Sequence, residues 1–282
     1  MVDVHCHILP GLDDGAVDVK ESLAMAQSAI SDGVTHVVAT PHSSSEFRFD
    51  YERVRALHGQ LQRLVGDRLV LATGCDFHLN LENLEMLRKD AARFCINQHN
   101  YLLVEFSEYS IPPTTSHALH DMQLMGLHPI ITHPERNGII QAQTSLLASW
   151  IRLGCFGQVT GGSLTGTFGP KAQADALRWI EMGLVHFVAS DAHNTRGRPL
   201  RLQPSYQVVQ ERFGDLKARA LFVDNPMAAF EGRELPHVPE VAPHAEGKPR
   251  WHLPVPTVES RSTPPRATSQ RSWRERTPST TR

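Results

Sequence analysis

The sequence lacks the features that identify several common protein classes. None of its apolar runs approaches the roughly 18 residues that a membrane-spanning helix needs, and its opening residues, MVDVHCH, lack the basic and apolar segments of a secretory signal. The four cysteines, at positions 6, 75, 95 and 155, have no CxxC spacing, which argues against a zinc knuckle or a disulfide framework. These absences predict a cytoplasmic protein with reduced cysteines and no membrane span.

A strong charge of one sign is also missing. The 282 residues carry a formal net charge of −2 with histidine neutral, and residues 1–235 contain more acidic than basic side chains. No basic stripe beside stacking aromatic residues is present, so we expect no nucleic-acid partner. The sequence has no GxGxxG or GK[ST] phosphate loop. None of its cysteines has the arginine six positions later that a cysteine-dependent phosphatase requires, which argues against a thiolate nucleophile.

Helix-like stretches and apolar β-branched runs alternate along the chain. Five such helical stretches end at a glycine, and the runs that follow finish in polar residues: VTHVVATPH after Gly33, DRLVLATGCD after Gly66, LHPIITHPER after Gly126, CFGQVTGGS after Gly154 and LVHFVASDAH after Gly183. Adding residues 2–5 and 101–106 gives about seven strands, which predicts an α/β fold with a parallel sheet. A closed barrel is favoured over an open sheet because polar residues follow most of the strands.

The C-terminal part has a different composition from the rest. Residues 236–282 hold nine of the 19 prolines, with serine, threonine and arginine filling most of the other positions. Such a segment has too few apolar side chains to form a packed core. We therefore predict one folded domain over residues 1–235 and a disordered tail over residues 236–282.

Histidine is abundant, and its spacing suggests metal binding. His5 and His7 form an HxH pair at the end of the first predicted strand, so their imidazoles share one face and can bind one ion. The turn Asp13-Asp14-Gly15 follows, and either of its carboxylates can face inward. A D-x-H pair, Asp191 and His193, mirrors this arrangement after the last predicted strand.

Single ligand-type residues also end the strands between these two pairs. They are His42 after the second strand, Asp76 after the third, Glu105 near the end of the fourth and His133 after the fifth. Buried charges at equivalent strand ends would repel one another and lose hydration unless cations neutralise them. All the donors are nitrogen or oxygen, which suits Mn²⁺, iron or Zn²⁺, and the share of carboxylates favours manganese.

The motifs combine into a family resemblance. HCHILPGLDDG, ATPH, YLLVEF, PIITHPERN, QVTGGSLTGTFG and ASDAHNTRGRP occur in this order over about residues 1–231. Together they resemble the polymerase and histidinol phosphatase (PHP) superfamily, and within it the bacterial tyrosine phosphatases of capsule and exopolysaccharide synthesis. The resemblance implies a distorted, TIM-like (βα)7 barrel that holds three divalent metal ions.

The resemblance also implies a ligand set and a catalytic set. His5, His7 and Asp191 would hold the first metal, Asp76 would bridge it to a second that Glu105 and His133 complete, and Asp14, His42 and His193 would hold the third. On this basis Asp14 is preferred to Asp13. We expect Arg136, Arg198 and Asp191 to be catalytic, with the two guanidinium groups binding phosphate oxygens. A surface ion pair is the alternative for each arginine.

Two positions depart from the family pattern. Asp76 stands where glutamate is usual, and its side chain is one methylene shorter, which bears on metal spacing and activity. The segment QVTGGS has glycine where serine is common.

The implied activity is hydrolysis of phosphotyrosine by a metal-activated water. The implied partner is a phosphorylated bacterial tyrosine kinase that controls polysaccharide chain length. Tyrosine, with a pKa near 10, leaves readily without a dedicated acid. Two alternatives remain open: a phosphatase of small molecules such as histidinol phosphate, and a non-catalytic metal-binding module. The HPERN and SDAHN contexts favour the tyrosine phosphatases.

Overall fold

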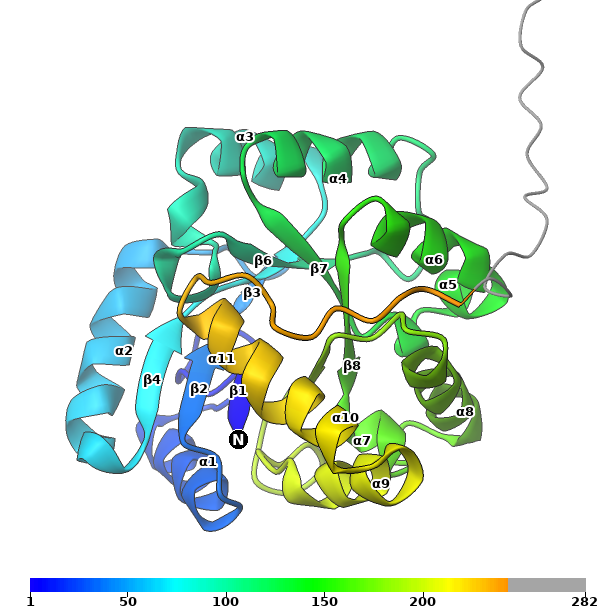
Figure 1. Ribbon diagram of the computed structural model, residues 1–282. Helices are drawn as coiled ribbons and strands as arrows, with labels where there is room; N and C mark the ends of the chain where they lie inside the picture. Colours follow the sequence, from blue (N-terminus) through cyan, green and yellow to red (C-terminus); the bar gives the residue numbers. More distant parts are fainter. Residues whose placement is uncertain (243–282) are drawn as a thin grey trace, which may run out of the picture. The chain divides into compact units, whose positions relative to one another are not determined.

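The computed structural model describes residues 1–242, in which strands alternate with helices (Figure 1). The strands are β1 (Val2–Cys6), β2 (His36–Ala39), β3 (His42–Ser43), β4 (Val70–Thr73), β5 (Asp76–His78), β6 (Tyr101–Glu105), β7 (His128–Thr132), β8 (Phe156–Thr160) and β9 (Phe187–Ala189). Each pairing between them is parallel. The predicted α/β class with parallel strands is confirmed.

The seven predicted strands are found as two hydrogen-bonded sheets. Their strand orders are β1–β2–β4 and β3–β5–β6–β7–β8–β9. Two of the predicted strands are interrupted. One is divided into β2 and β3 by residues 40–41, and the other into β4 and β5 by residues 74–75. The Asp76 N–H still donates to the Pro41 carbonyl across this gap (3.1 Å). Because Pro41 has no N–H, it cannot donate a hydrogen bond back to the neighbouring strand. The ladder of hydrogen bonds between the two strands is interrupted there.

The first and last strands lie next to each other without a continuous ladder. An isolated parallel bridge pairs Cys6, the last residue of β1, with Ala192, which follows β9. The His7 N–H donates to the Ala192 carbonyl and the Asp191 N–H donates to the His5 carbonyl, both at 2.9 Å. These two bonds link the two sheets at the edge where the histidine and aspartate pairs occur.

A β-bulge in β1 turns the first histidine toward that edge. Val2 pairs with His36 in regular register, but Cys6 pairs with Ala39, one residue earlier than that register requires. The extra residue reverses the alternation of side chains along the strand. Cys6 therefore packs in the cluster that faces the helices, and His5 faces the opposite side of the strand.

Helices surround the strands (Figure 1). They are α1 (Val19–Ser31), α2 (Tyr51–Val65), α3 (Leu81–Lys89), α4 (Thr115–Leu124), α5 (Gly138–Ala142), α6 (Thr144–Arg152), α7 (Gly161–Leu164), α8 (Pro170–Glu181), α9 (Gln203–Phe213), α10 (Asp215–Arg219) and α11 (Asn225–Phe230), with a π-helical turn at Ala220–Asp224 and 3₁₀ turns at Gly66–Arg68, Ala91–Arg93, Ile96–Gln98 and Pro134–Arg136. The five glycines predicted to end helices have positive φ angles between 63° and 94°, which confirms those helix ends.

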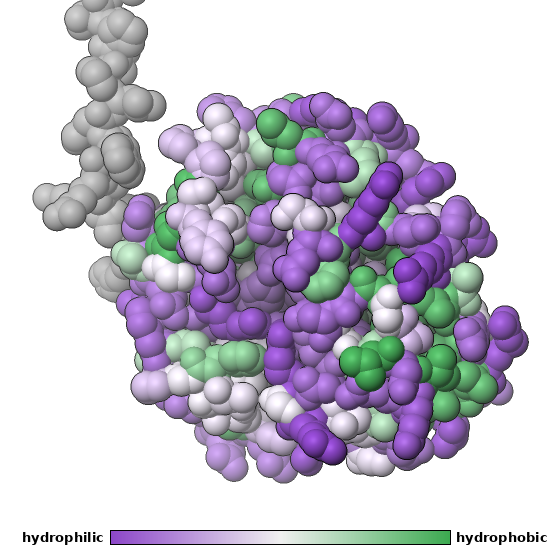
Figure 2. All heavy atoms as spheres, turned by 180° about the vertical axis from the view of Figure 1, so that it is seen from behind, coloured by the Kyte–Doolittle hydropathy of each residue, from purple (hydrophilic) through white to green (hydrophobic). Residues whose placement is uncertain are grey.

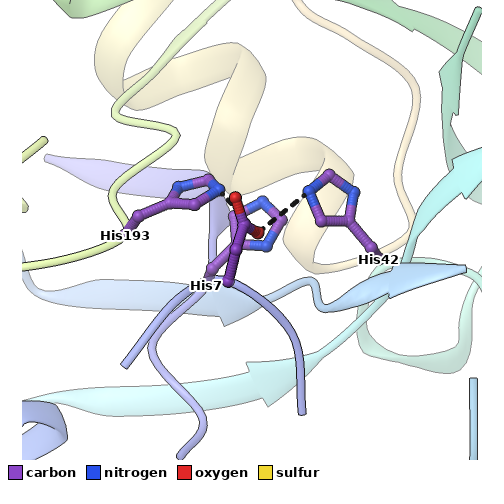
Figure 3. A group of neighbouring side chains, drawn as sticks. His7, His42 and His193 are labelled. Carbon is purple, nitrogen blue, oxygen red and sulfur yellow. Dashed lines mark ion pairs between the residues drawn. The ribbon is translucent and has the colours of Figure 1, made fainter. Parts of the chain in front are cut away.

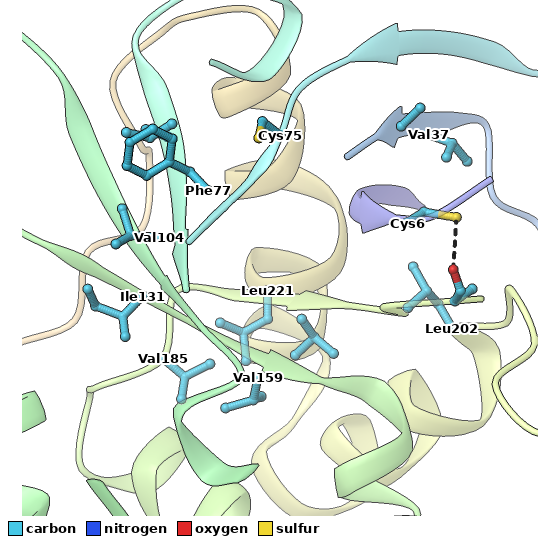
Figure 4. Close-up of a cluster of buried hydrophobic side chains, with 14 of the residues drawn as sticks. Cys6, Val37, Cys75, Phe77, Val104, Ile131, Val159, Val185, Leu202 and Leu221 are labelled. Atoms are coloured by element: carbon cyan, nitrogen blue, oxygen red, sulfur yellow. Dashed lines mark hydrogen bonds between the residues drawn. The ribbon is translucent and has the colours of Figure 1, made fainter. Parts of the chain in front are cut away.

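Apolar side chains form two clusters on the two faces of the strands. The larger cluster lies between strands and helices and includes Val104, Ile131 and Val159 (Figure 4). The smaller cluster lies on the other face of the strands, near the residues at which the strands begin, and includes Phe230 of α11. This helix crosses the same end of the strands (Figure 1). All four cysteines are buried with free thiols, as predicted. The face opposite to that of Figure 1 is mainly hydrophilic, with small hydrophobic groups (Figure 2).

The first residues of the predicted tail lie against the domain. The Asn225 side chain accepts a hydrogen bond from the His237 N–H (3.1 Å) and donates one to the His237 carbonyl (2.8 Å). The Ala242 N–H donates to the Met182 carbonyl (3.0 Å). The rest of the predicted tail, residues 243–282, lies outside the described residues. Within residues 1–242, no helix has the length and apolar character needed to cross a membrane.

Candidate metal centre

The nine predicted ligands meet at the carboxyl ends of the strands. They are His5 in β1, His7 and Asp14 after it, His42 in β3, Asp76 in β5, Glu105 in β6, His133 after β7, and Asp191 and His193 after β9. Among the described residues, three groups have ligand atoms within 4.8 Å of one another: His7, Asp14, His42 and His193; His5, His7 and Asp76; and His42, Asp76 and Glu105. Each group has the composition of a divalent metal site.

Hydrogen bonds orient the HxH pair. Nδ1–H of His5 donates to Oε1 of Gln158 (3.0 Å), and Nδ1–H of His7 donates to Oδ2 of Asp13 (2.7 Å). When the two rings are neutral, as metal coordination requires, these bonds leave the lone pairs on the Nε2 atoms, which lie 3.2 Å apart. Nε2 of His5 also lies 3.5 Å from carboxylate oxygens of Asp76 and of Asp191. A cation coordinated between the two nitrogens would remove their mutual repulsion.

The two neighbouring aspartates of the first loop have different roles. Oδ1 of Asp14 lies 3.4 Å from Nε2 of His42 and 3.3 Å from Nε2 of His193, and Figure 3 shows the imidazoles converging on this carboxylate. The Asp13 carboxylate instead accepts a hydrogen bond from Nδ1–H of His7, on the side of the ring away from Nε2. It also accepts a hydrogen bond from the His42 backbone N–H (3.0 Å). Asp14 therefore faces the cluster, and Asp13 supports it from outside.

Asp76 lies at the centre of the second group. Its side chain is fully buried, and Oδ2 lies 3.2 Å from Nδ1 of His42 and 3.9 Å from Nε2 of His133. Glu105 approaches the same two histidines at 3.7 Å. The shorter side chain of aspartate thus still reaches imidazoles on three strands, since it also contacts His5.

Asp191 connects the histidines to both predicted arginines. Oδ1 lies 3.4 Å from Nε2 of His7 and 3.6 Å from Nδ1 of His193. Oδ2 pairs with the guanidinium groups of Arg136 and Arg198, each of which is only 24% exposed. The arginines are therefore paired with a buried carboxylate of the site and not with a residue of the exposed surface.

Opposite charges dominate the electrostatics of the cluster. Burial lowers the pKa of His5, but the carboxylates of Asp76 and Asp191 outweigh it and raise that pKa to about 9. Burial likewise opposes charge on His42, yet Asp14 and Asp76 raise its pKa to about 11. Burial raises the carboxyl pKa values, but the charge of His5 helps to hold those of Asp76 and Asp191 well below the usual range. The carboxylates are therefore kept in the ionised form that metal coordination requires.

Two candidate ligands have strained backbones. The φ angles of His133 and Asp191 are 31° and 50°, positive values that are uncommon for residues other than glycine, although histidine and aspartate adopt them more often than most. Such conformations persist only where surrounding contacts enforce them, and they concentrate at functional sites. His133 directly follows β7 and Asp191 is the second residue after β9, so these conformations turn their side chains toward the cluster at the strand ends.

Sequence reasoning missed several supporting residues. Asp3 is fully buried and accepts hydrogen bonds from the Ser190 N–H (2.9 Å) and hydroxyl (2.5 Å), and burial raises its pKa to about 6. Glu135 is buried and accepts from the Thr160 N–H (2.8 Å). His78 lies 3.4 Å from Glu105, and its D-x-H spacing from Asp76 repeats that of the last strand, a signal that could have identified it.

The donor set fits divalent cations. Oδ2 of Asp76 and Nε2 of His193 are buried and, among the described residues, have ion-pair contacts at 3.2 Å or more but no hydrogen bond. Buried polar atoms without a hydrogen bond are unfavourable unless another group binds them. Both atoms belong to the groups described above, whose remaining members are also imidazole nitrogens and carboxylate oxygens. Cations of the manganese, iron or zinc type would satisfy these atoms and neutralise the carboxylates.

The fold and the centre together define a parallel α/β protein with a histidine- and carboxylate-lined metal-binding centre at its strand ends. Residues 1–231 match the family described as capsular polysaccharide synthesis, CpsB/CapC. The chain therefore belongs to the CpsB/CapC family, and the predicted resemblance is confirmed.

Individual relatives agree with this assignment. The chain is 38% identical to tyrosine-protein phosphatase YwqE of Bacillus subtilis (strain 168), over 76% of this chain and 85% of YwqE. It is 32% identical to tyrosine-protein phosphatase CpsB of Streptococcus pneumoniae, over 80% of this chain and 96% of CpsB.

Solved structures extend the comparison. A crystal structure from a study of YwqE from Bacillus subtilis and CpsB from Streptococcus pneumoniae, described there as unique metal-dependent tyrosine phosphatases, superposes with a TM-score of 0.78 at 34% identity, covering 86% of this chain and 99% of that chain. A β-aspartyl dipeptidase from Fervidobacterium islandicum AW-1 shares the fold alone, with a TM-score of 0.53 at 15% identity.

Proposed function

We propose that this protein is a metal-dependent protein-tyrosine phosphatase. The observation that carries the proposal is the buried cluster of imidazoles and carboxylates whose last member, Asp191, also binds two guanidinium groups. Metal ligands and phosphate-binding groups are thereby joined in one site, as hydrolysis of a phosphomonoester requires. Membership of a family whose relatives are named tyrosine-protein phosphatases supports the same conclusion.

The proposed ligand set is the one that the family resemblance implies. His5, His7 and Asp191 would hold one ion, Glu105 and His133 with Asp76 would hold a second, with Asp76 shared between the two, and Asp14, His42 and His193 would hold a third. When bound, ions of Mn²⁺, which we propose ahead of iron or Zn²⁺, would supply Lewis-acid chemistry that activates water and neutralises phosphate oxygens. The contacts at 3.2–3.9 Å around Asp76 support its role as a bridge despite its shorter side chain.

The chain's own residues perform the remaining steps. Arg136 and Arg198 bind the non-bridging phosphate oxygens and hold phosphorus in line with the attacking water. The tyrosine oxygen leaves without a dedicated acid because its conjugate acid has a pKa near 10. No cysteine takes part: burial raises the pKa of Cys6 and of Cys75 well above the usual value, so neither supplies a thiolate.

The substrate and architecture complete the proposal. The substrate is the phosphotyrosine of a bacterial tyrosine kinase of polysaccharide export, met on the cytoplasmic side of the membrane. The two sheets together form a distorted (βα)7 barrel, and the bridge between Cys6 and Ala192 supports its closure.

The proposed domain boundary at residue 235 is tested by removing the chain after Leu235, which also removes the contacts of His237 and Ala242. An unchanged melting temperature would support the boundary. Loss of soluble protein would mean that the domain includes these residues.

The test is phosphate release by the Mn²⁺-loaded protein from three substrates. A phosphotyrosine peptide, a phosphoserine peptide and histidinol phosphate are compared, with a chelator-treated sample as control. We expect hydrolysis to favour phosphotyrosine and to stop when the chelator is added. A preference for histidinol phosphate would identify a small-molecule phosphatase. Bound metal without hydrolysis of any of the three would identify a non-catalytic metal-binding module.

A further inference from the structure

One aromatic ring contacts both arginines of the site. The guanidinium carbon of Arg136 lies 4.4 Å from the centroid of the Phe168 ring, and that of Arg198 lies 5.9 Å from it. Both guanidinium groups also pair with Asp191. Each is therefore held from two directions, by a carboxylate and by the face of a ring. The proposed function uses the arginines and Asp191 but gives Phe168 no role.

The neighbouring backbone leaves room for this ring. Phe168 lies in the segment between α7 and α8, and a Cβ atom added at Gly162 would lie 2.9 Å from its Cε2 atom. Real Cβ atoms essentially never approach a heavy atom within 3.0 Å, so any larger residue at position 162 would displace the ring. Gly162 belongs to the QVTGGS segment that follows β8. The glycine thus permits the contact between Phe168 and the arginines.

Packing in the core does not explain Phe168. Its side chain is half-buried, and among the described residues neither hydrophobic cluster includes it. With Arg198, Gly161, Gly162 and other residues it lines a cavity of about 140 Å³. The ring therefore has open space beside it and makes its closest charged contact with Arg136.

We propose that Phe168 is a positioning residue that orients Arg136 and Arg198 for phosphate binding. The inference rests on the proposed role of the two arginines. The negative face of the ring attracts a guanidinium group and disfavours its rotation away from the ring. Donors that are already oriented bind a phosphate more tightly than donors that must be ordered first. Phe168 itself does not contact the substrate.

The first test measures binding of inorganic phosphate to the Mn²⁺-loaded full chain by calorimetry. Phe168→Leu removes the ring, and we expect phosphate affinity to fall about tenfold, because a partly buried ring holds two cations. Phe168→Tyr keeps the ring and should bind phosphate within about twofold of the unchanged protein. Metal content and melting temperature should be unchanged in both variants. Equal losses in the Leu and Tyr variants, or no loss in either, would overturn the proposal.

A matched control uses a second arginine–phenylalanine pair of the chain. The guanidinium carbon of Arg212 lies 5.6 Å from the ring of Phe213 at the end of α9, and neither residue belongs to the metal centre. Phe213→Leu should therefore leave phosphate affinity unchanged. A loss equal to that of Phe168→Leu would mean that removal of any such ring perturbs the site indirectly, and the proposal would be wrong.

A second readout does not depend on catalysis. The Nε–H resonances of Arg136 and Arg198 report ring contact and guanidinium rotation in NMR spectra. Phe168→Leu should shift both resonances and speed up rotation, while Phe168→Tyr should preserve them. If Phe168→Leu does not fold, Gly162→Ala displaces the ring without removing it and should give the same changes. Unchanged resonances in a folded variant contradict the proposal even if the chain proves to have no phosphatase activity.

Discussion

Two fully buried histidines, one at each end of the strands, have opposite properties. His5 lies in the metal centre, and nearby carboxylates raise its pKa to about 9 in spite of burial. His186 lies just before β9 at the other end, where burial and, to a smaller extent, the charge of Lys217 lower its pKa to about 3. Burial alone favours the neutral form in both, so the difference comes from Asp76 and Asp191 beside His5.

The comparison distinguishes a functional end of the fold, the carboxyl ends of the strands with the metal centre, from a structural end, the amino ends of the strands where His186 lies. At the structural end His186 accepts a hydrogen bond from the Gly157 N–H (3.2 Å), and its ring packs 5.0 Å from that of Phe156. At the functional end the histidines contact carboxylates. Opposite charges gathered at one end indicate selection for binding, whereas neutral packing at the other end indicates stability.

The largest effect should come from removing a histidine at the functional end. His7→Ala deletes an imidazole that faces Asp191 and three other histidines. We expect loss of bound metal together with a fall in phosphatase activity of about a thousandfold or more, because the nucleophile depends on the metal. Elemental analysis and phosphate release measure the two effects.

The matched control is a histidine at the structural end. His128→Ala removes a ring that lies 4.8 Å from Tyr101 at the start of β7. Metal content and activity should both be retained in this variant. If His128→Ala releases metal as His7→Ala does, the distinction between the two ends is wrong.

A smaller effect, without loss of metal, should follow removal of an arginine. Arg198→Ala leaves the imidazoles and carboxylates in place but removes a phosphate-binding group. We expect metal content to be retained and kcat/KM to fall about a hundredfold, as when one preorganised donor is lost from a transition state. Arg201→Ala is the control, because Arg201 pairs with Asp32 and is 56% exposed. Unchanged kinetics for Arg198→Ala would contradict the phosphate-binding role.

The positions of the ligands could be predicted from the sequence because of one geometric rule. Parallel strands that alternate with helices bring the residues after each strand to the same edge, so His42, Asp76 and His133 must lie close together. The glycines that end the helices locate the strands. The α/β class and the gathering of ligands follow from these two patterns.

Other features depend on contacts that a linear pattern does not contain. The bulge in β1, which turns His5 toward the site, depends on how the strand pairs with β2. The roles of Asp13 and Asp14 differ only because the backbone of one turn directs their carboxylates to opposite sides of the histidines. The contact of Phe168 with both arginines requires the packed loops.

A more modest effect on metal affinity should result from weakening the hydrogen bond that orients one of the ligands, while the ligand itself is kept. Asp13→Asn keeps the shape of the side chain but weakens the charged hydrogen bond to Nδ1 of His7, which is 2.7 Å long. Partners of this kind fix ring orientation, and their loss lowers metal affinity roughly 10- to 100-fold. Titration of the metal-free protein with Mn²⁺ measures the change. An affinity equal to that of the unchanged protein would show that Asp13 does not orient His7.

The smallest effect belongs to the structural end and concerns stability alone. The folded pKa of His186, about 3, lies below its unfolded value, so below pH 6.5 the unfolded chain binds a proton that the folded chain does not. Stability is therefore lost as the pH falls from about 6.5 toward 3, by roughly 2 kcal/mol at pH 5. His186→Asn can still accept a hydrogen bond from the Gly157 N–H, but it does not titrate. Urea unfolding at pH 8 and pH 5 should show that this variant loses about 2 kcal/mol less than the unchanged protein. Equal losses in the two proteins would mean that His186 is protonated in the fold, and the contrast with His5 would disappear.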